Sequence, residues 1–277
     1  MSEKFSQKMF LRDLKLPFCP GCGNYSVINC FLRAVYELGY RNFKNFVFCS
    51  GIGCAAWIPS PYFLADSIHT PHGRSIPIAM GIKLVRPELN VVVFGGDGDL
   101  AGIGLSHLIH AARRNVDITV FMINNQVYGM TGGQVAPTTF LNLRTTTTPY
   151  GNIERPLDVS RVIADVGACY VARWTTIHRE ELKESMKRAI LTEGFSFVEI
   201  LSQCPTMFGR HAGFKSPAEI TKWFKEKSIL VEESKKLSEQ ELADKIIVGE
   251  FITKKFVHLS QALKGLKERA GGDGNEG

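Results

Sequence analysis

Polar side chains follow two short apolar segments in the middle of the chain. Asp97 comes after the apolar run at residues 91–94, and Asn125 comes after a second run at residues 118–123. The intervening residues 100–114 repeat apolar positions with a period close to 3.6 and end in two arginines, which predicts one helix. Strand, helix and strand in this order predict a parallel βαβ unit.

The carboxyl ends of parallel neighbouring strands lie at the same edge of a sheet, so Asp97 and Asn125 are expected to face one crevice. Gly96 and Gly98 flank Asp97 and allow close approach of the backbone to a ligand. The N-terminus of the following helix favours a phosphate. Carboxylate and amide oxygens are ligands that Mg²⁺ prefers. The segment therefore predicts Mg²⁺ and a diphosphate.

A second interpretation of these glycines is a Rossmann nucleotide site, with Gly98, Gly102 and Gly104 as its fingerprint. That site expects an acidic residue at the end of the next strand. The chain has the two amides Asn124 and Asn125 there instead. The pattern therefore favours the diphosphate and metal site over the Rossmann site.

Four cysteines form a second group with chemical potential. Cys19 and Cys22 make a CxxC turn, whereas Cys54 and Cys204 each follow a predicted strand and can meet that turn at one sheet edge. Four thiolates suit a structural Zn²⁺ or a [4Fe–4S] cluster, and spacing alone does not choose between them. The odd total of 7 cysteines argues against a disulfide framework.

Composition is ordinary for a globular protein, with 44% hydrophobic and 22% charged residues. The formal net charge of +6 is spread along the chain without a basic run, which argues against nucleic acid as a partner. We find no apolar run of membrane-spanning length and no signal-peptide core, and we expect a cytoplasmic protein with no membrane contact.

Strand and helix patterns alternate over most of the chain and predict an α/β fold, a doubly wound and mostly parallel sheet. The expected strands are residues 46–49, 91–94, 118–123, 170–172 and 196–200, and the expected helices are residues 25–38, 75–85, 100–114, 158–166 and 179–192.

The regions outside this alternation carry separate expectations. We expect residues 1–215 to form the ligand-binding α/β domain and residues 216–277 to form a charged extension that packs on a partner. Its last residues, 271–277, are expected to be disordered. The long loop at residues 135–156 is expected to cover the active site.

Specific motifs resemble a known family. Gly96-Asp97-Gly98 with Asn124-Asn125 resembles the signature of thiamine-diphosphate enzymes, and VYGMTGGQ at residues 127–134 resembles the β subunit of 2-oxoacid:ferredoxin oxidoreductases. The cysteine contexts CPGCG, SGIGC and CPT resemble the same subunit. The resemblance covers roughly residues 19–208 and implies the thiamine-diphosphate-binding fold of the diphosphate-binding domain.

The resemblance also implies roles for individual residues. Asp97, Asn125 and the Val127 carbonyl would hold Mg²⁺, and Cys19, Cys22, Cys54 and Cys204 would bind one [4Fe–4S] cluster. A block containing His69, His72 and Arg74 would line the thiamine pocket as catalytic residues. The implied cofactor-binding residues are Gly53, Gly73, Gly96, Asp97, Gly98, Asp99, Asn125, Val127, Tyr128, Gly129, Met130 and Thr131.

The implied activity is oxidative decarboxylation of a 2-oxoacid, with coenzyme A as co-substrate and ferredoxin as electron acceptor. An α subunit would supply the pyrimidine-binding domain and the activating glutamate, with gamma and ferredoxin-like delta subunits as further candidate partners. Some two-subunit relatives have lysines at the positions of Trp57 and Gly132, which this sequence lacks. The run at residues 56–62 together with Gly132-Gly133 resembles the multi-subunit 2-oxoglutarate branch.

Other interpretations remain open at this point. The substrate can be pyruvate or a branched-chain 2-oxoacid with the same chemistry. A thiamine decarboxylase without a cluster is disfavoured by the four placed cysteines, because plain decarboxylation needs no electron carrier. A zinc-stapled nucleotide-binding regulatory module is the alternative from a different functional class.

Overall fold

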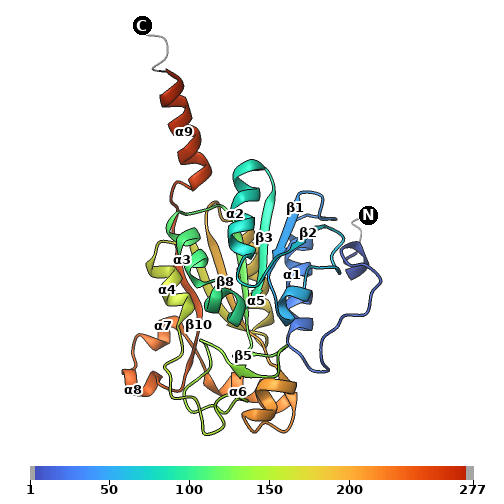
Figure 1. Cartoon of the computed structure of the whole chain (residues 1–277), viewed down its shortest axis with the longest axis vertical. Helices are drawn as coiled ribbons and strands as arrows, with labels where there is room; N and C mark the ends of the chain where they lie inside the picture. The colour runs from blue at the N-terminus through green and yellow to red at the C-terminus, as the bar shows by residue number, and fades with distance from the viewer. Residues whose placement is uncertain (1–3, 273–277) are drawn as a thin grey trace.

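The computed structural model describes residues 4–272 and has one large sheet of strand order β2-β1-β3-β4-β8-β7-β10-β9 (Figure 1). Neighbouring strands are parallel except for β10, which pairs antiparallel with β7. The strands are β1 (Phe46–Ser50), β2 (Asp66–His69), β3 (Asn90–Gly96), β4 (Thr119–Asn124), β7 (Tyr170–Thr175), β8 (Ser196–Leu201), β9 (Ser228–Leu230) and β10 (Ile246–Thr253). The strands β5 (Val127–Tyr128) and β6 (Gln134–Val135) form a separate small hairpin.

Helices cover both faces of the large sheet. The helices are α1 (Asn24–Glu37), α2 (Ser75–Val85), α3 (Leu105–Arg113), α4 (Val159–Asp165), α5 (Arg179–Leu191), α6 (Pro217–Lys227), α7 (Val231–Ser234), α8 (Glu239–Leu242) and α9 (Leu259–Gly272). The doubly wound, mostly parallel α/β fold predicted from the sequence is confirmed.

The two faces have separate hydrophobic cores because side chains alternate along each strand. In β3, Val92 and Phe94 belong to the core that contains α1 and α5, whereas Val91 and Val93 belong to the core that contains α2, α3 and α4. The first core is rich in aromatic rings, and Phe31 of α1 packs edge-to-face on Phe94 with ring centroids 5.1 Å apart. A strand buried on both faces must be apolar throughout, which explains the continuous apolar runs in the sequence.

The carboxyl ends of β1, β3, β4 and β8 lie next to one another in the sheet. The loops that follow these four strands carry Cys54, Asp97, Asn125 and Cys204, respectively. Gly96 at the end of β3 pairs with Ile123 of β4, so Asp97 and Asn125 leave the sheet at the same level. The predicted meeting of these residues at one sheet edge is therefore confirmed.

The helix expected at residues 100–114 is not continuous. Residues Gly98–Ile103 form a wide π-helical turn, and α3 begins only at Leu105. The break lies at Gly102, whose ψ of −111° is not helical. A Cβ atom at Gly102 would lie 2.6 Å from the Tyr128 hydroxyl, so the chain packs closely against that tyrosine where the helix breaks. The periodicity of residues 100–114 does not indicate this contact.

The C-terminal segment contributes to the main sheet. Strands β9 and β10 extend it beyond β7, and α9 projects from the body of the molecule (Figure 1). The domain boundary near residue 215 and the packing of this segment on a partner stay predictions. The helix α9 includes residues 271 and 272, where we expected disorder, and residues 273–277 lie outside the described residues.

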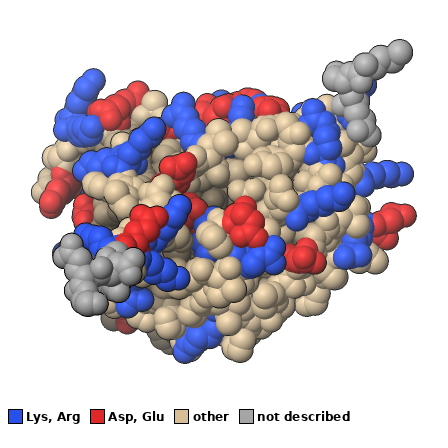
Figure 2. Space-filling model, turned by 90° about the horizontal axis from the view of Figure 1, so that it is seen from above, with Lys and Arg blue, Asp and Glu red and all other residues tan. Residues whose placement is uncertain are grey.

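The surface carries both signs of charge. Figure 2 shows lysines and arginines interspersed with aspartates and glutamates on the face seen from above. Within residues 4–272, none of the helices combines the length and the apolar character needed to cross a membrane.

Candidate functional site

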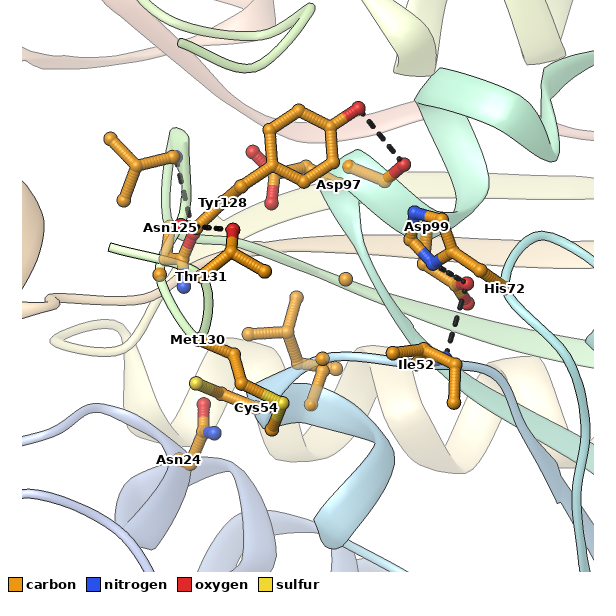
Figure 3. Close-up of a pocket in the computed structure, with 17 residues that line it drawn as sticks. Asn24, Ile52, Cys54, His72, Asp97, Asp99, Asn125, Tyr128, Met130 and Thr131 are labelled. Atoms are coloured by element: carbon orange, nitrogen blue, oxygen red, sulfur yellow. Dashed lines mark hydrogen bonds and ion pairs between the residues drawn. The ribbon is translucent and has the colours of Figure 1, made fainter. Parts of the chain in front are cut away.

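A cavity of about 260 Å³ opens at the carboxyl ends of β3 and β4 (Figure 3). We call it the Asp97 cavity. It brings together most of the predicted cofactor-binding residues, although they come from separate loops. Its lining residues include His72, Gly53, Gly96, Asp97, Gly98, Asp99, Asn125, Val127, Tyr128, Gly129, Met130 and Thr131.

Asp97 is 2% exposed at the base of this cavity. Burial raises the pKa of its carboxyl group to about 6, against the opposing effect of hydrogen bonds from Thr138 and nearby backbone N–H groups. In the described part of the chain, Asp97 has no ion pair with a lysine, arginine or histidine. A buried carboxylate without a cationic side chain is suited to a metal ion.

Asn125 and Val127 also line this cavity, and each carries an oxygen atom that could bind a metal ion. The Asn125 Oδ1 atom accepts a hydrogen bond from the Val127 N–H at 3.2 Å. Between them, Gln126 has a φ of +65°, a left-handed conformation that turns the chain. A carboxylate, an amide oxygen and a backbone carbonyl form a hard oxygen donor set, so these residues fit Mg²⁺.

Glycine is required where the loop after β3 meets Tyr128. A Cβ atom at Gly98 would lie 2.2 Å from the tyrosine ring, closer than any real contact. At Gly96, in contrast, the nearest atom to such a Cβ is 4.0 Å away, on Ala55. The Gly98 requirement therefore comes from packing against Tyr128, while Gly96 leaves open space beside the cavity.

Asp99 lines the cavity and also makes contacts that the sequence did not predict. Its Oδ1 atom accepts hydrogen bonds from the Gly73 N–H at 2.7 Å and the Ile52 N–H at 3.3 Å, and lies 2.9 Å from His72 Nδ1. Burial raises the pKa of the Asp99 carboxyl group, opposed by these three donors. Asp99 and Gly73 thus tie the loops of the cavity wall together, and their cofactor contacts stay predictions.

The three predicted catalytic residues do not all reach the cavity. His72 lines it, whereas His69 is exposed and packs its ring 6.0 Å from that of Trp57. Arg74 donates from Nη1 to the Gly73 carbonyl at 3.2 Å and is absent from the cavity wall. Any contact of His69 or Arg74 with a ligand stays a prediction.

The four cysteines line a second cavity of about 120 Å³, which we call the cysteine cavity. Cys19, Cys22, Cys54 and Cys204 all contribute to its wall. The CxxC turn is fixed to the loop after β8 by the Gly23 N–H, which donates to the Gln203 carbonyl at 2.9 Å.

The thiols of this cavity affect one another's protonation. The pKa of the Cys22 thiol is raised to about 12, mainly by burial and in smaller part by repulsion from the other three cysteines. Burial likewise raises the pKa of the Cys54 thiol to about 11. Thiols held neutral in this way need a metal centre to stabilise their thiolate forms. The remaining cysteines, Cys30, Cys49 and Cys169, are buried in the fold, as expected for packing residues.

The two cavities share part of their walls. Four residues line both of them, namely Asn24, Cys54, Asn125 and Met130. Figure 3 shows the side chains of Asn24, Cys54 and Met130 gathered below Asn125 and Thr131. A group bound in one cavity would therefore lie directly beside a group bound in the other.

Sequence reasoning missed several residues of the site. Asn24, at the start of α1, lines both cavities and is 3% exposed, but no motif in the sequence marks it as a site residue. Thr138 lies in the loop that we expected to cover the site, yet its hydroxyl donates to Asp97 from beside the cavity. No local pattern distinguishes Thr138 from the other threonines of that loop. The role of the loop as a cover stays a prediction.

Comparison with known proteins agrees with this geometry. Residues 51–200 match the family model of the thiamine pyrophosphate enzyme C-terminal TPP-binding domain. The matched segment contains Cys54, Asp97 and Asn125. The fold and the Asp97 cavity thus define a thiamine-pyrophosphate-binding domain.

Relatives narrow the class. The chain is 51% identical to the 2-oxoglutarate synthase subunit KorB of Methanocaldococcus jannaschii over 88% of this chain and 90% of that one. It is 43% identical to the 2-oxoacid:ferredoxin oxidoreductase subunit beta of Saccharolobus solfataricus over 68% of this chain and 62% of that one. The chain belongs to the family of 2-oxoacid:ferredoxin oxidoreductase β subunits.

A solved structure shares the whole fold. The chain superposes with a TM-score of 0.85 and 34% identity on the 2-oxoglutarate:ferredoxin oxidoreductase from Magnetococcus marinus, over 97% of this chain and 92% of that one. That structure has 2-oxoglutarate, coenzyme A and succinyl-CoA bound.

Proposed function

We propose that this chain is the subunit of a 2-oxoglutarate:ferredoxin oxidoreductase that holds Mg²⁺, thiamine diphosphate and one [4Fe–4S] cluster. The assembled enzyme converts 2-oxoglutarate and coenzyme A to succinyl-CoA and CO₂, and passes two electrons, one at a time, to ferredoxin. The observation that carries the proposal is the shared wall of the two cavities, formed by Asn24, Cys54, Asn125 and Met130.

The Asp97 cavity supports thiamine diphosphate. Asp97, Asn125 and the Val127 carbonyl would hold the Mg²⁺ that binds the diphosphate, because they supply only oxygen donors to one cavity. Bound thiamine diphosphate supplies a carbon nucleophile that permits loss of CO₂ from a 2-oxoacid. The chain's own residues orient the cofactor and exclude water, and the Gly98 and Tyr128 contact shapes the wall beside it.

The cysteine cavity supports an iron–sulfur cluster over zinc. Four thiolates around one cavity can hold either Zn²⁺ or a [4Fe–4S] cluster. Zn²⁺ is redox-inactive and could not take electrons from the proposed reaction, whereas a [4Fe–4S] cluster accepts electrons singly.

The chain is incomplete as a thiamine enzyme by itself. None of the residues that line the Asp97 cavity is a glutamate, so the glutamate that activates the aminopyrimidine ring would come from an α subunit. Apolar side chains at the cavity mouths support this docking: Ile52 is 42%, Trp57 38% and Met130 49% exposed. Gamma and ferredoxin-like delta subunits, and a cytoplasmic location, belong to the same proposal.

The choice of 2-oxoglutarate rests on the named relatives and on the ligands of the Magnetococcus marinus structure. Trp57 and Gly132, which replace the lysines of some two-subunit relatives, support the same branch. Coenzyme A is the proposed acyl acceptor, since that structure contains it.

The test is to purify the native complex anaerobically and assay it with 2-oxoglutarate, pyruvate and a branched-chain 2-oxoacid. Each assay contains coenzyme A and either ferredoxin or a viologen dye. We expect reduction of the acceptor with 2-oxoglutarate at least about tenfold faster than with the others. Equal or higher rates with pyruvate would reject the substrate assignment. Colourless protein that contains one equivalent of zinc and shows no activity would reject the enzyme assignment in favour of a zinc-stapled module.

A further inference from the structure

One side chain outside the Asp97 cavity contacts the proposed metal ligand directly. Thr138 Oγ1 donates a hydrogen bond of 2.5 Å to Asp97 Oδ2. Thr138 is 3% exposed and does not line the cavity, so its hydroxyl acts on a bound ligand only through Asp97. It belongs to the irregular segment that connects β6 to α4.

Asn124 fixes the position of this hydroxyl. Its Nδ2 atom donates to Glu199 Oε1 at 2.7 Å, which directs its Oδ1 atom toward Thr138 Oγ1 at 3.1 Å. The amide orientation follows from chemistry, because a carboxylate accepts hydrogen bonds and cannot donate them. Asn124 Oδ1 already accepts from the Gln126 N–H at 3.0 Å.

The Thr138 hydroxyl has one hydrogen and two acceptors within reach. The carboxylate of Asp97 is the stronger acceptor and the nearer one, so the hydrogen goes to Asp97. The Asn124 oxygen does not need this hydrogen, because it already accepts a hydrogen bond from the Gln126 N–H. The hydroxyl therefore holds Oδ2 of Asp97 in one position, and it is the side-chain donor to this carboxylate beside its backbone N–H donors.

The support behind Asn124 is rigid. Glu199, at 2% exposure on β8, also accepts from Ser160 at 2.5 Å and from Arg173 Nε at 2.8 Å. Arg173 in turn pairs with Asp158. Three strands and one helix thus anchor a buried polar chain that ends at Asp97, and such chains keep a single side-chain conformation.

We infer that Thr138 is a positioning residue for the metal site: its hydroxyl holds the Asp97 carboxylate in the orientation that binds Mg²⁺. The inference rests on the proposed function and adds a residue to it. Losing the hydroxyl would leave Asp97 in place with its backbone N–H donors but without the side-chain donor that orients Oδ2. The requirement for Mg²⁺ would rise, whereas the diphosphate pocket itself would be unchanged.

The experiment measures thiamine diphosphate binding by titration calorimetry on the native complex at a series of Mg²⁺ concentrations. Thr138→Val keeps the shape of the side chain and removes the hydroxyl, and Thr138→Ser keeps the hydroxyl. The matched control is Thr119→Val. Thr119 is a buried threonine at the start of β4, at the opposite end of the strand from Asn124, and its hydroxyl donates to the Ala189 carbonyl at 3.2 Å.

We expect Thr138→Val to raise the Mg²⁺ concentration for half-maximal cofactor binding by about tenfold, the usual effect of losing a residue that supports a metal ligand. Saturating Mg²⁺ should restore the cofactor affinity of Thr138→Val, and Thr138→Ser and Thr119→Val should stay within about twofold of the unmodified protein. If Thr138→Val does not fold, Thr138→Ala provides the same comparison.

Two results would overturn the inference. One is an unchanged Mg²⁺ requirement in Thr138→Val, and the other is a loss of affinity that saturating Mg²⁺ does not restore. A different failure identifies the proposed function as the error: the unmodified complex would then bind thiamine diphosphate equally well with and without Mg²⁺.

Discussion

The Nδ1 atom of His72 lies 2.9 Å from Oδ1 of Asp99, and this contact joins two loops of the Asp97 cavity wall. The same oxygen accepts hydrogen bonds from the Gly73 and Ile52 N–H groups, so two backbone donors and the His72 ring converge on one atom from two loops. The other oxygen of Asp99 is buried and has no hydrogen-bond partner among the described residues. One carboxylate oxygen therefore connects the loops after β1 and β2 to the turn after β3.

This convergence makes Asp99 a residue whose loss should cost stability. Asp99→Ala leaves the donors without their acceptor and should lower the free energy of unfolding by about 2 kcal/mol. Asp99→Asn retains an oxygen at the same position and should cost less than about 1 kcal/mol. Urea unfolding followed by circular dichroism measures both values. Equal losses in the two variants would contradict the role of the Oδ1 atom.

Asp97 is the only carboxylate in the proposed Mg²⁺ ligand set. Asp97→Asn keeps the size of the side chain and removes its charge, so it should weaken Mg²⁺-dependent thiamine diphosphate binding by more than about 100-fold. The cofactor that co-purifies with the complex can be quantified by chromatography. Asp66→Asn, an exposed position on β2, serves as the control and should retain the cofactor. Normal retention in Asp97→Asn would rule out this metal site.

Cys204 reaches the cysteine cavity from the loop after β8. Cys204→Ser should fold normally but lose most of its bound iron and sulfide, and with them the reduction of ferredoxin, because serine replaces one thiolate ligand. Iron and sulfide analysis of anaerobically purified protein measures the first effect. Cys30→Ser is the matched control, since Cys30 is a buried cysteine of α1 whose Sγ contacts the Arg179 carbonyl instead. A full iron content in Cys204→Ser would remove Cys204 from the cluster.

Arg173 is 8% exposed and binds both Glu199 and Asp158. Arg173→Met should lower the free energy of unfolding by about 3–5 kcal/mol, because it leaves a buried negative charge without a partner. Arg188→Met, which breaks the exposed pair with Glu250, should cost less than about 1 kcal/mol. Denaturant unfolding of the two variants under the same conditions measures both losses of unfolding free energy. Similar costs would show that the Arg173 network is no more important than a surface pair.

The sequence by itself determined the layers of the fold and the edge at which the chemistry lies. Apolar runs of strand length separated by amphipathic segments specify parallel strands, and parallel strands bring their carboxyl ends to one edge whatever their order in the sheet. This is why Asp97, Asn125, Cys54 and Cys204 were expected to meet before their distances were known. Asp97 and Asn125 directly follow a strand, and Cys54 and Cys204 lie within a few residues of one, so their place depends on local structure.

Only the tertiary structure decided which of two adjacent side chains enters the site and which distant residues contact it. Of the adjacent amides, Asn125 lines the cavity while Asn124 points to Glu199, because consecutive residues at a strand end project to opposite sides. Thr138 contacts Asp97, and β10 pairs with β7. Both contacts join segments that are distant in sequence, and the hydrophobic periodicity does not predict them. The break at Gly102 likewise depends on Tyr128 from another loop. Such contacts are set by the closure of loops over a finished sheet, and the sequence pattern carries no local signal for them.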